Sequence, residues 1–149
     1  MRRYMFAAVL AYLVPTFALG FVCHLVLFQS YYDALGVYRR DIIIPFGFLS
    51  MLIQAVIFAW VYGKTFAASR GTLLSGALRY GLVGATLSWS FTTLAVAAKN
   101  VMASVPDYLL IETAFTIVQW ALVAPLTAVS AGRPSQYEAR VAIGAESRL

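Results

Sequence analysis

The sequence predicts an all-α protein, an integral-membrane four-helix bundle whose two termini both face the cytoplasm. Four long stretches of the 149-residue chain carry no charge or a single one, and a helix that crosses a bilayer needs roughly 20 apolar residues. Hydrophobic residues make up 62% of the chain and charged residues 11%, which are too few to cover a water-soluble domain. Stretches such as residues 46–60 lack the alternation of polar and apolar side chains that is typical of a membrane barrel.

The chain divides into one predicted transmembrane domain, residues 1–130, and a polar cytoplasmic tail, residues 131–149. Helices are the simplest spanning element, because lipid offers no hydrogen-bond partner to a bare amide. We expect them at about residues 4–28, 42–63, 80–98 and 107–130. The tail contains Gly132, Pro134 and charges of both signs, a composition that favours disorder or a docking strip for a partner.

The first expected helix contains Pro15 near its middle, which predicts a kink. Its apolar run is much longer than the roughly 7–15 residues of a signal-peptide core, so we expect it to be retained. Cys23 is the only cysteine, which excludes an intramolecular disulfide and a CxxC redox pair.

The remaining helices have recognisable starts. Pro45 falls in the first turn of the second helix, where a missing amide donor costs nothing. The third follows a joint, residues 63–79, that is rich in glycine and serine. The fourth begins after Ser104 as a cap, with Pro106 in the first turn and Asp107 at the positive end of the helix dipole.

The Lys and Arg residues predict the orientation. Of the 11, eight fall at one end of the expected helices and three at the other. The first set is Arg2, Arg3, Lys64, Arg70, Arg79, Arg133, Arg140 and Arg148, and the second is Arg39, Arg40 and Lys99. Because cytoplasmic loops carry the excess of positive charge, we expect both termini in the cytoplasm. The net charge of +5 is then a topology signal, and no basic soluble face favours nucleic acid.

Each expected helix carries one stripe of small or polar residues at helical spacing, and we call these the polar stripes. They are Thr16, Gly20 and His24; Gly47, Ser50 and Gln54; Gly84, Ser88, Thr92 and Lys99; and Glu112, Thr116 and Gln119. Residues three or four apart share a helix face. Because polar side chains in lipid face protein or water, we expect the stripes to converge on the axis of the bundle.

Depth along the helices groups these residues into two expected layers. His24, Glu112 and Lys99 fall near the outer boundary and form a candidate binding cluster. Gln54, Gln119, Ser88 and Thr92 fall near the midplane. Each layer has an alternative interpretation, because small residues allow helices to approach closely, amides cross-link them, and Glu112 could simply be neutralised by a neighbour. An ionisable residue inside a membrane is nevertheless a functional-site hypothesis by default.

The residue types in this sequence fit poorly with the known kinds of catalytic and cofactor sites. One histidine excludes bis-His haem within a chain, and a zinc site needs three or four ligands where only two converge. The histidine has no serine on its stripe, and no glycine-rich phosphate loop is present. We therefore expect no cofactor and no metal.

Residues 80–130 resemble a family of uncharacterised four-helix bacterial membrane proteins. The likeness consists of Gly81-Leu82 before a segment rich in Ser and Trp, Lys99-Asn100 at the helix exit, and Leu110-Ile111-Glu112 at the start of the fourth helix. The resemblance implies a four-helix fold in a membrane, and no activity is agreed for the family.

The leading functional prediction is non-catalytic: an accessory, stabilising or assembly subunit in the bacterial inner membrane, with the lipid bilayer and a membrane protein or further copies of itself as partners. It depends on the expectation that four short helices cannot enclose a large pocket. The alternative is a small ion or solute transporter whose outer cluster is a proton-linked gate. An enzyme acting on lipid, with Glu112 and His24 as acid and base, is the third.

Overall fold

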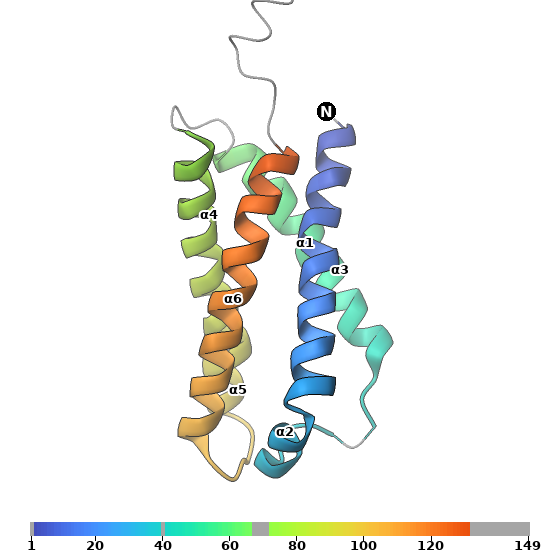
Figure 1. Ribbon diagram of the computed structural model, residues 1–149, viewed down its shortest axis with the longest axis vertical. Coiled ribbons are helices and arrows are strands. Elements are labelled where there is room, and N and C mark those ends of the chain that lie inside the picture. The colour runs from blue at the N-terminus through green and yellow to red at the C-terminus, as the bar shows by residue number, and fades with distance from the viewer. Residues whose placement is uncertain (1, 40, 67–71, 132–149) are drawn as a thin grey trace, which may run out of the picture.

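The computed structural model describes residues 2–39, 41–66 and 72–131, and every regular element in these ranges is helical. Figure 1 shows their arrangement. In chain order the helices are α1 (Arg2–Val22), α2 (Gln29–Leu35), α3 (Ile44–Val61), α4 (Leu73–Ser88), α5 (Ala95–Ala97) and α6 (Val105–Ala131). Three π-helical segments, in which hydrogen bonds reach one residue further than in an α-helix, continue them: η1 (Cys23–Leu27), η2 (Tyr62–Phe66) and η3 (Trp89–Leu94).

Within the part of the chain that the structure describes, three helical segments are long and apolar enough to cross a membrane: Tyr4–Leu27, Ile44–Phe66 and Val105–Ala131. They coincide with three of the four expected spans. The fourth, expected over residues 80–98, is part of a continuous helical segment, residues 73–97, that is not among the three. Its serines, threonines and glycines make it less apolar than the others.

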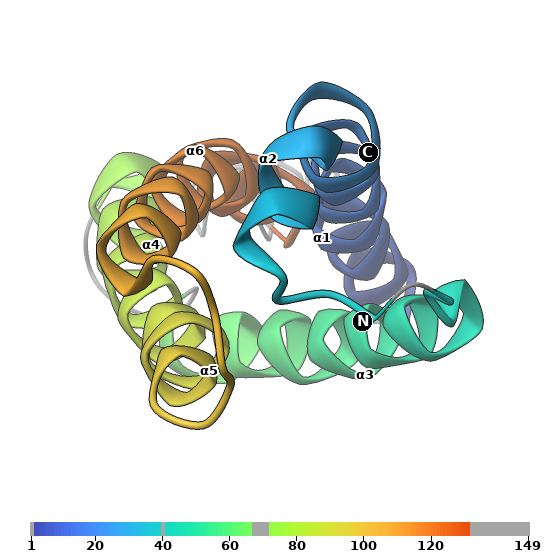
Figure 2. The same cartoon turned by 90° about the horizontal axis from the view of Figure 1, so that it is seen from below.

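Helix α6 lies between α1 and α4 and packs along both (Figure 1). The start of α1 and the end of α6 lie at the same end of the molecule. Helix α3 packs against α1 but crosses the other long helices at an angle, so that it runs across the view in Figure 2. Its π-helical end, η2, contacts α4 and α6, while its first turns lie away from α5.

Aromatic side chains fill the centre of the packed region. Tyr12, Tyr80 and Trp120 are almost completely buried, with the Tyr80 and Trp120 ring centroids 5.3 Å apart. Gly84 makes this packing possible, because a Cβ atom at that position would lie 2.1 Å from the indole ring of Trp120. Trp120 is therefore part of the core.

The two connections at the other end form a cap. The sequence predicts an irregular loop over residues 29–41, but this segment contains α2, which ends at Gly36 with a left-handed φ of 71°. The amide of Ala103 donates to the Leu35 carbonyl at 2.9 Å, and Tyr32, Leu35 and Tyr108 form a small buried cluster. Local polarity suggested a loop, whereas burial of Tyr32 and Leu35 against α6 stabilises a helix.

Helix starts agree in part with the expectations. The Asp107 amide donates to Ser104 Oγ at 3.4 Å, and Pro45 occupies the first turn of α3. The third helix begins earlier than expected, because Thr72 caps it by accepting from the Ser75 amide at 3.3 Å. The predicted tail lies, apart from Ala131, outside the described residues.

Candidate functional site

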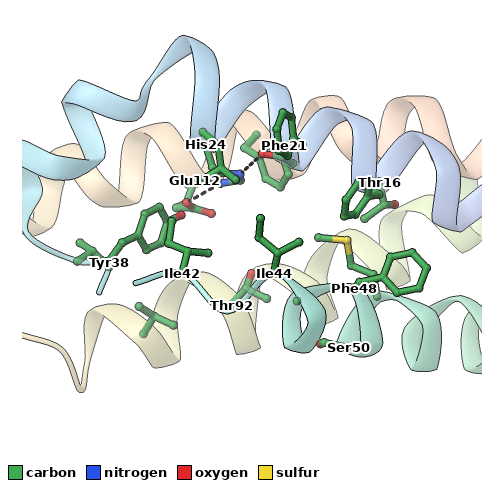
Figure 3. A pocket seen from close by; sticks show the side chains of 18 of the residues that line it. Thr16, Phe21, His24, Tyr38, Ile42, Ile44, Phe48, Ser50, Thr92 and Glu112 are labelled. Carbon is green, nitrogen blue, oxygen red and sulfur yellow. Dashed lines mark hydrogen bonds and ion pairs between the residues drawn. The ribbon is translucent and has the colours of Figure 1, made fainter. Parts of the chain in front are cut away.

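A cavity of about 660 Å³ opens between α1, the first turns of α3, η3 and the start of α6 (Figure 3). All four polar stripes contribute to its lining. The contributing stripe residues are Thr16, Gly20, His24, Gly47, Ser50, Gln54, Ser88, Thr92, Glu112 and Gln119. The stripes therefore converge on an open space, which exists because α3 is tilted away from η3 and α5.

The rest of the lining is largely apolar and aromatic. The rings are those of Phe17, Phe21, Phe48, Phe91, Phe115, Tyr38 and Tyr108. Arg39, which is exposed, and Asn100 lie on the connections at the capped end. Residues 41–50 are all exposed, so the first turns of α3 cover the cavity on one side without being covered themselves.

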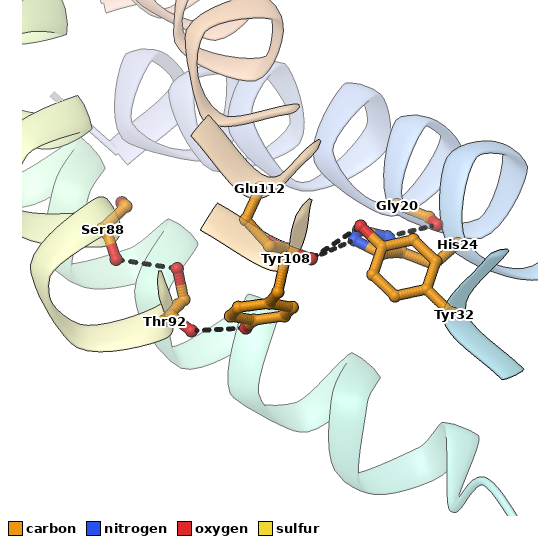
Figure 4. A network of polar contacts seen from close by, with 7 residues as sticks. All are labelled: Gly20, His24, Tyr32, Ser88, Thr92, Tyr108 and Glu112. Carbon is orange, nitrogen blue, oxygen red and sulfur yellow. Dashed lines mark hydrogen bonds and ion pairs between the residues drawn. The ribbon is translucent and has the colours of Figure 1, made fainter. Parts of the chain in front are cut away.

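Glu112 is the centre of the polar network (Figure 4). Its side chain is buried, and its Oε1 atom meets two partners. The Tyr32 hydroxyl donates to Oε1 at 2.7 Å, and His24 Nε2 lies 3.2 Å from the same oxygen. These contacts join α2, η1 and α6. The structure thus brings His24 and Glu112 together across 88 positions of sequence.

A backbone carbonyl of α1 orients His24. Its Nδ1 atom lies 2.9 Å from the Gly20 carbonyl oxygen, one turn earlier. The imidazole ring packs edge-on against Phe115 at a centroid distance of 4.4 Å and lies 4.9 Å from the ring of Tyr32. With one nitrogen on a carbonyl and the ring between aromatic neighbours, the second nitrogen is directed at Glu112 (Figure 4).

The Tyr32 hydroxyl keeps its proton. Burial raises the pKa of Tyr32 well above its ordinary value, and the hydrogen bond to Glu112 raises it further. Tyr32 is therefore a fixed donor to Oε1.

The midplane residues also face the cavity, but Gln54 and Gln119 are bonded to α1 and not to each other. The Tyr12 hydroxyl donates to Gln54 Oε1 at 3.0 Å, and Gln119 Nε2 donates to Thr16 Oγ1 at 3.3 Å. Each amide thus links its helix to α1, as expected of a residue that cross-links helices.

Ser88 and Thr92 connect α4 and η3 to α6. The Trp120 indole N–H donates to Ser88 Oγ at 3.1 Å. The Thr92 hydroxyl donates to the Ser88 carbonyl at 2.8 Å, and the Tyr108 hydroxyl donates to the Thr92 carbonyl at 3.1 Å (Figure 4). These hydrogen bonds fix the positions of Ser88 and Thr92 at the cavity surface.

Lys99 is not in the cluster that the sequence predicted. The α-helix ends at Ala97, and Lys99 follows in an exposed turn, with no ion pair to another described residue. Lys99 does not line the cavity, because the chain leaves the helix before that position. Tyr32 takes the place that the prediction assigned to Lys99.

Tyr32, Tyr38 and Tyr108 were missed as site residues. All three fall at the ends of apolar stretches, where a tyrosine is usually an anchor at the membrane surface. The one available signal was the sequence Tyr31-Tyr32, about two helical turns beyond His24, and it does not say which of the two rings turns inward.

A second cavity, of about 300 Å³, lies on the other side of the midplane residues. It shares four lining residues with the first: Gln54, Ser88, Phe91 and Thr92. Among the described residues, no three His, Cys, Asp or Glu side chains gather in a way that could hold a metal ion.

A scan against protein-family models, a search of curated proteins and a search of solved structures each found no match to this chain. The resemblance of residues 80–130 therefore stays a prediction.

Proposed function

We propose that this chain is a small integral-membrane transporter. It crosses the membrane with four helices, keeps both termini in the cytoplasm, and binds a small solute in the larger cavity. One observation carries the proposal: polar stripes from all four long helical segments line a single cavity that contains a buried carboxylate in contact with an imidazole. Ionisable groups in a membrane usually mark the path of a substrate or a proton.

The cavity volume favours this function over the accessory subunit that the sequence alone favoured. That prediction assumed four short helices could not enclose a large pocket. A volume of about 660 Å³ lies within the range of roughly 300–1,000 Å³ that is typical of small-molecule sites. Aromatic walls with a few converging polar groups are also typical of such sites.

The second cavity supports a path through the protein. The two cavities meet at Gln54, Ser88, Phe91 and Thr92, near the midpoint of the expected spans. In this proposal these four residues form the barrier that a solute passes. In this proposal the exposed first turns of α3 move relative to η3, so that one cavity narrows while the other opens.

The test is solute-driven proton movement in proteoliposomes that contain a pH-sensitive dye. Three probes cover the charge classes: benzyltrimethylammonium, phenylacetate and benzyl alcohol. Ser50→Phe fills the cavity from an exposed lining position, and Ile53→Phe adds the same bulk on the same helix outside the lining. We expect one probe to change the internal pH in the wild type and in Ile53→Phe, and the change to be lost in Ser50→Phe. A wild type that responds to none of the probes contradicts the proposal.

A further inference from the structure

We infer that the solute is a monovalent organic cation with an apolar body, and that it exchanges for one proton held between His24 and Glu112. This inference rests on the proposed function and names the substrate class of the same cavity. It comes from the hydrogen-bond geometry of His24 together with the position of the second oxygen of Glu112.

His24 faces an acceptor at each ring nitrogen. The Gly20 carbonyl at Nδ1 can only accept, so Nδ1 carries a hydrogen. At Nε2 the contact to Glu112 Oε1 then needs one more proton, either on the imidazole or on the carboxyl group. In both arrangements the pair is neutral overall. Without that proton a nitrogen lone pair would face a carboxylate oxygen, and the pair would carry one negative charge.

The surroundings hold the two side chains of the pair in place. The imidazole ring lies 4.4 Å from the ring of Phe115 and 4.9 Å from that of Tyr32. The Tyr32 hydroxyl donates to Glu112 Oε1. In this proposal the resting site holds one proton between the imidazole and the carboxyl group.

Glu112 has a second oxygen for a ligand. Both of its contacts are made by Oε1, which leaves Oε2 for the cavity that Glu112 lines. A cation that reaches Oε2 replaces the charge of that shared proton. The exchange is balanced: one cation enters, the shared proton leaves to water, and the site remains neutral. Tyr32 stays bonded to Oε1 throughout.

The other groups at the cavity agree with a cation. Besides the pair, three titratable or charged side chains line the cavity: Arg39 on the connection after α2, Tyr38 beside it and Tyr108 on α6. The lining residues that belong to α3, α4 and η3 are all uncharged. Arg39 is exposed, so solvent screens its charge, whereas Glu112 is buried. An anion deep in the cavity would meet the carboxylate. An apolar cation would meet Glu112 and a wall of aromatic rings.

The test measures protons released on binding. Purified protein in weakly buffered detergent solution is titrated with benzyltrimethylammonium, with calorimetry for binding and an indicator dye for protons. We expect about one proton released per cation bound, and an apparent affinity that rises about tenfold per pH unit while the pair holds its proton. Raising the pH strengthens binding, because binding releases the proton.

Three variants make the result specific. Glu112→Gln should abolish binding, and Glu112→Asp should restore it with the same proton count. Asp33→Asn, which removes an exposed carboxylate of α2 outside the lining, should behave as the wild type. If Glu112→Gln does not fold, Ser50→Phe still reports whether the cation binds in the cavity. Cation binding without proton release, or undiminished in a folded Glu112→Gln, overturns the inference.

The two proposals fail in different ways. If phenylacetate or benzyl alcohol binds and Ser50→Phe prevents it, while the cation does not bind, the cavity is a solute site and only the cation inference is wrong. If none of the three probes shows binding that Ser50→Phe prevents, the proposed function is wrong and the inference with it.

Discussion

Glu112 shows how one residue acquires a role through its neighbours. In the sequence it is a lone carboxylate in an apolar helix. In the structure Tyr32 and His24 meet on one of its oxygens. His24 comes from the end of the first expected span, and Tyr32 comes from the connection that follows it. A buried carboxylate that kept no donor would be strongly destabilising, so these two residues stabilise the fold as well as the site.

Replacing Tyr32 should show this contribution. Tyr32→Phe keeps the ring, which is 1% exposed, and removes the donor to Glu112. We expect the free energy of unfolding to fall by about 1–3 kcal/mol, the usual effect of leaving a buried charged group without one partner. The adjacent Tyr31→Phe is the matched control, because that ring is 38% exposed and should leave stability unchanged. Denaturation in mixed micelles measures both, and equal values for the two variants would contradict the role given to Tyr32.

The lining was largely predictable from the sequence, and the details of the network were not. Thr16, Ser50 and Gln54 face the cavity because a polar residue that repeats at helical spacing cannot face lipid. Lys99 was misplaced because its position depends on where the helix ends. The partnership of Tyr32 depends on α2, whose existence follows from burial against a helix about 75 residues later and not from local pattern.

At the scale of helices, the tilt of α3 decides what the stripes can do. Parallel packing of four helices would press the stripes together, which was the basis of the structural alternative. Since the end of α3 and η2 pack against α4 while the first turns of α3 stay apart, the same residues line a cavity. The spacing of residues along the sequence shows which of them share a helix face, but it does not give the angle at which two helices cross. The cavity volume therefore could not be predicted from the sequence.

Close packing of α4 on α6 depends on Gly84. An added Cβ atom would lie 2.1 Å from the Trp120 ring, so Gly84→Ala must displace the indole and disturb its hydrogen bond to Ser88. We expect a loss of about 1–3 kcal/mol in the free energy of unfolding, as for other overpacked cores. Gly47→Ala is the control, because nothing lies within 4 Å of its added Cβ atom and alanine favours a helix by about 0.5–1 kcal/mol.

The measurement is again denaturation of the two variants in parallel with the wild type. Indole fluorescence would follow the displacement of Trp120 in a chain whose Trp60 and Trp89 are replaced by phenylalanine. Gly84→Ala as stable as Gly47→Ala would mean that α4 and α6 are not in close contact at this position.

At the scale of the whole molecule, the structure and the charge pattern divide the chain in the same way. The start of α1 and the end of α6 lie at one end, and the cap formed by α2 and the connection after α5 lies at the other (Figure 1). Among the described residues, Arg39 and Lys99 belong to the connections at the cap end. Arg2, Lys64 and Arg79 belong to the start of α1, to η2 and to the first half of α4, towards the opposite end. The cavity that contains Glu112 opens near the cap, so in the proposed function the orientation decides from which side of the membrane a solute would enter it.

The positive-inside rule therefore predicts that the cap faces away from the cytoplasm. A cysteine placed at the exposed Ser30 of α2, in a chain whose Cys23 is replaced by alanine, should react with a membrane-impermeant thiol reagent added to intact cells. A reporter that is active only in the cytoplasm should be active when it is fused after Leu149, and a reporter that is active only outside the cytoplasm should be inactive there. A cysteine at the exposed Thr72 is the control, because it lies at the opposite end and should be labelled only after the cells are opened. The reverse pattern would place Glu112 near the cytoplasmic face, and the solute would then enter the larger cavity from inside the cell.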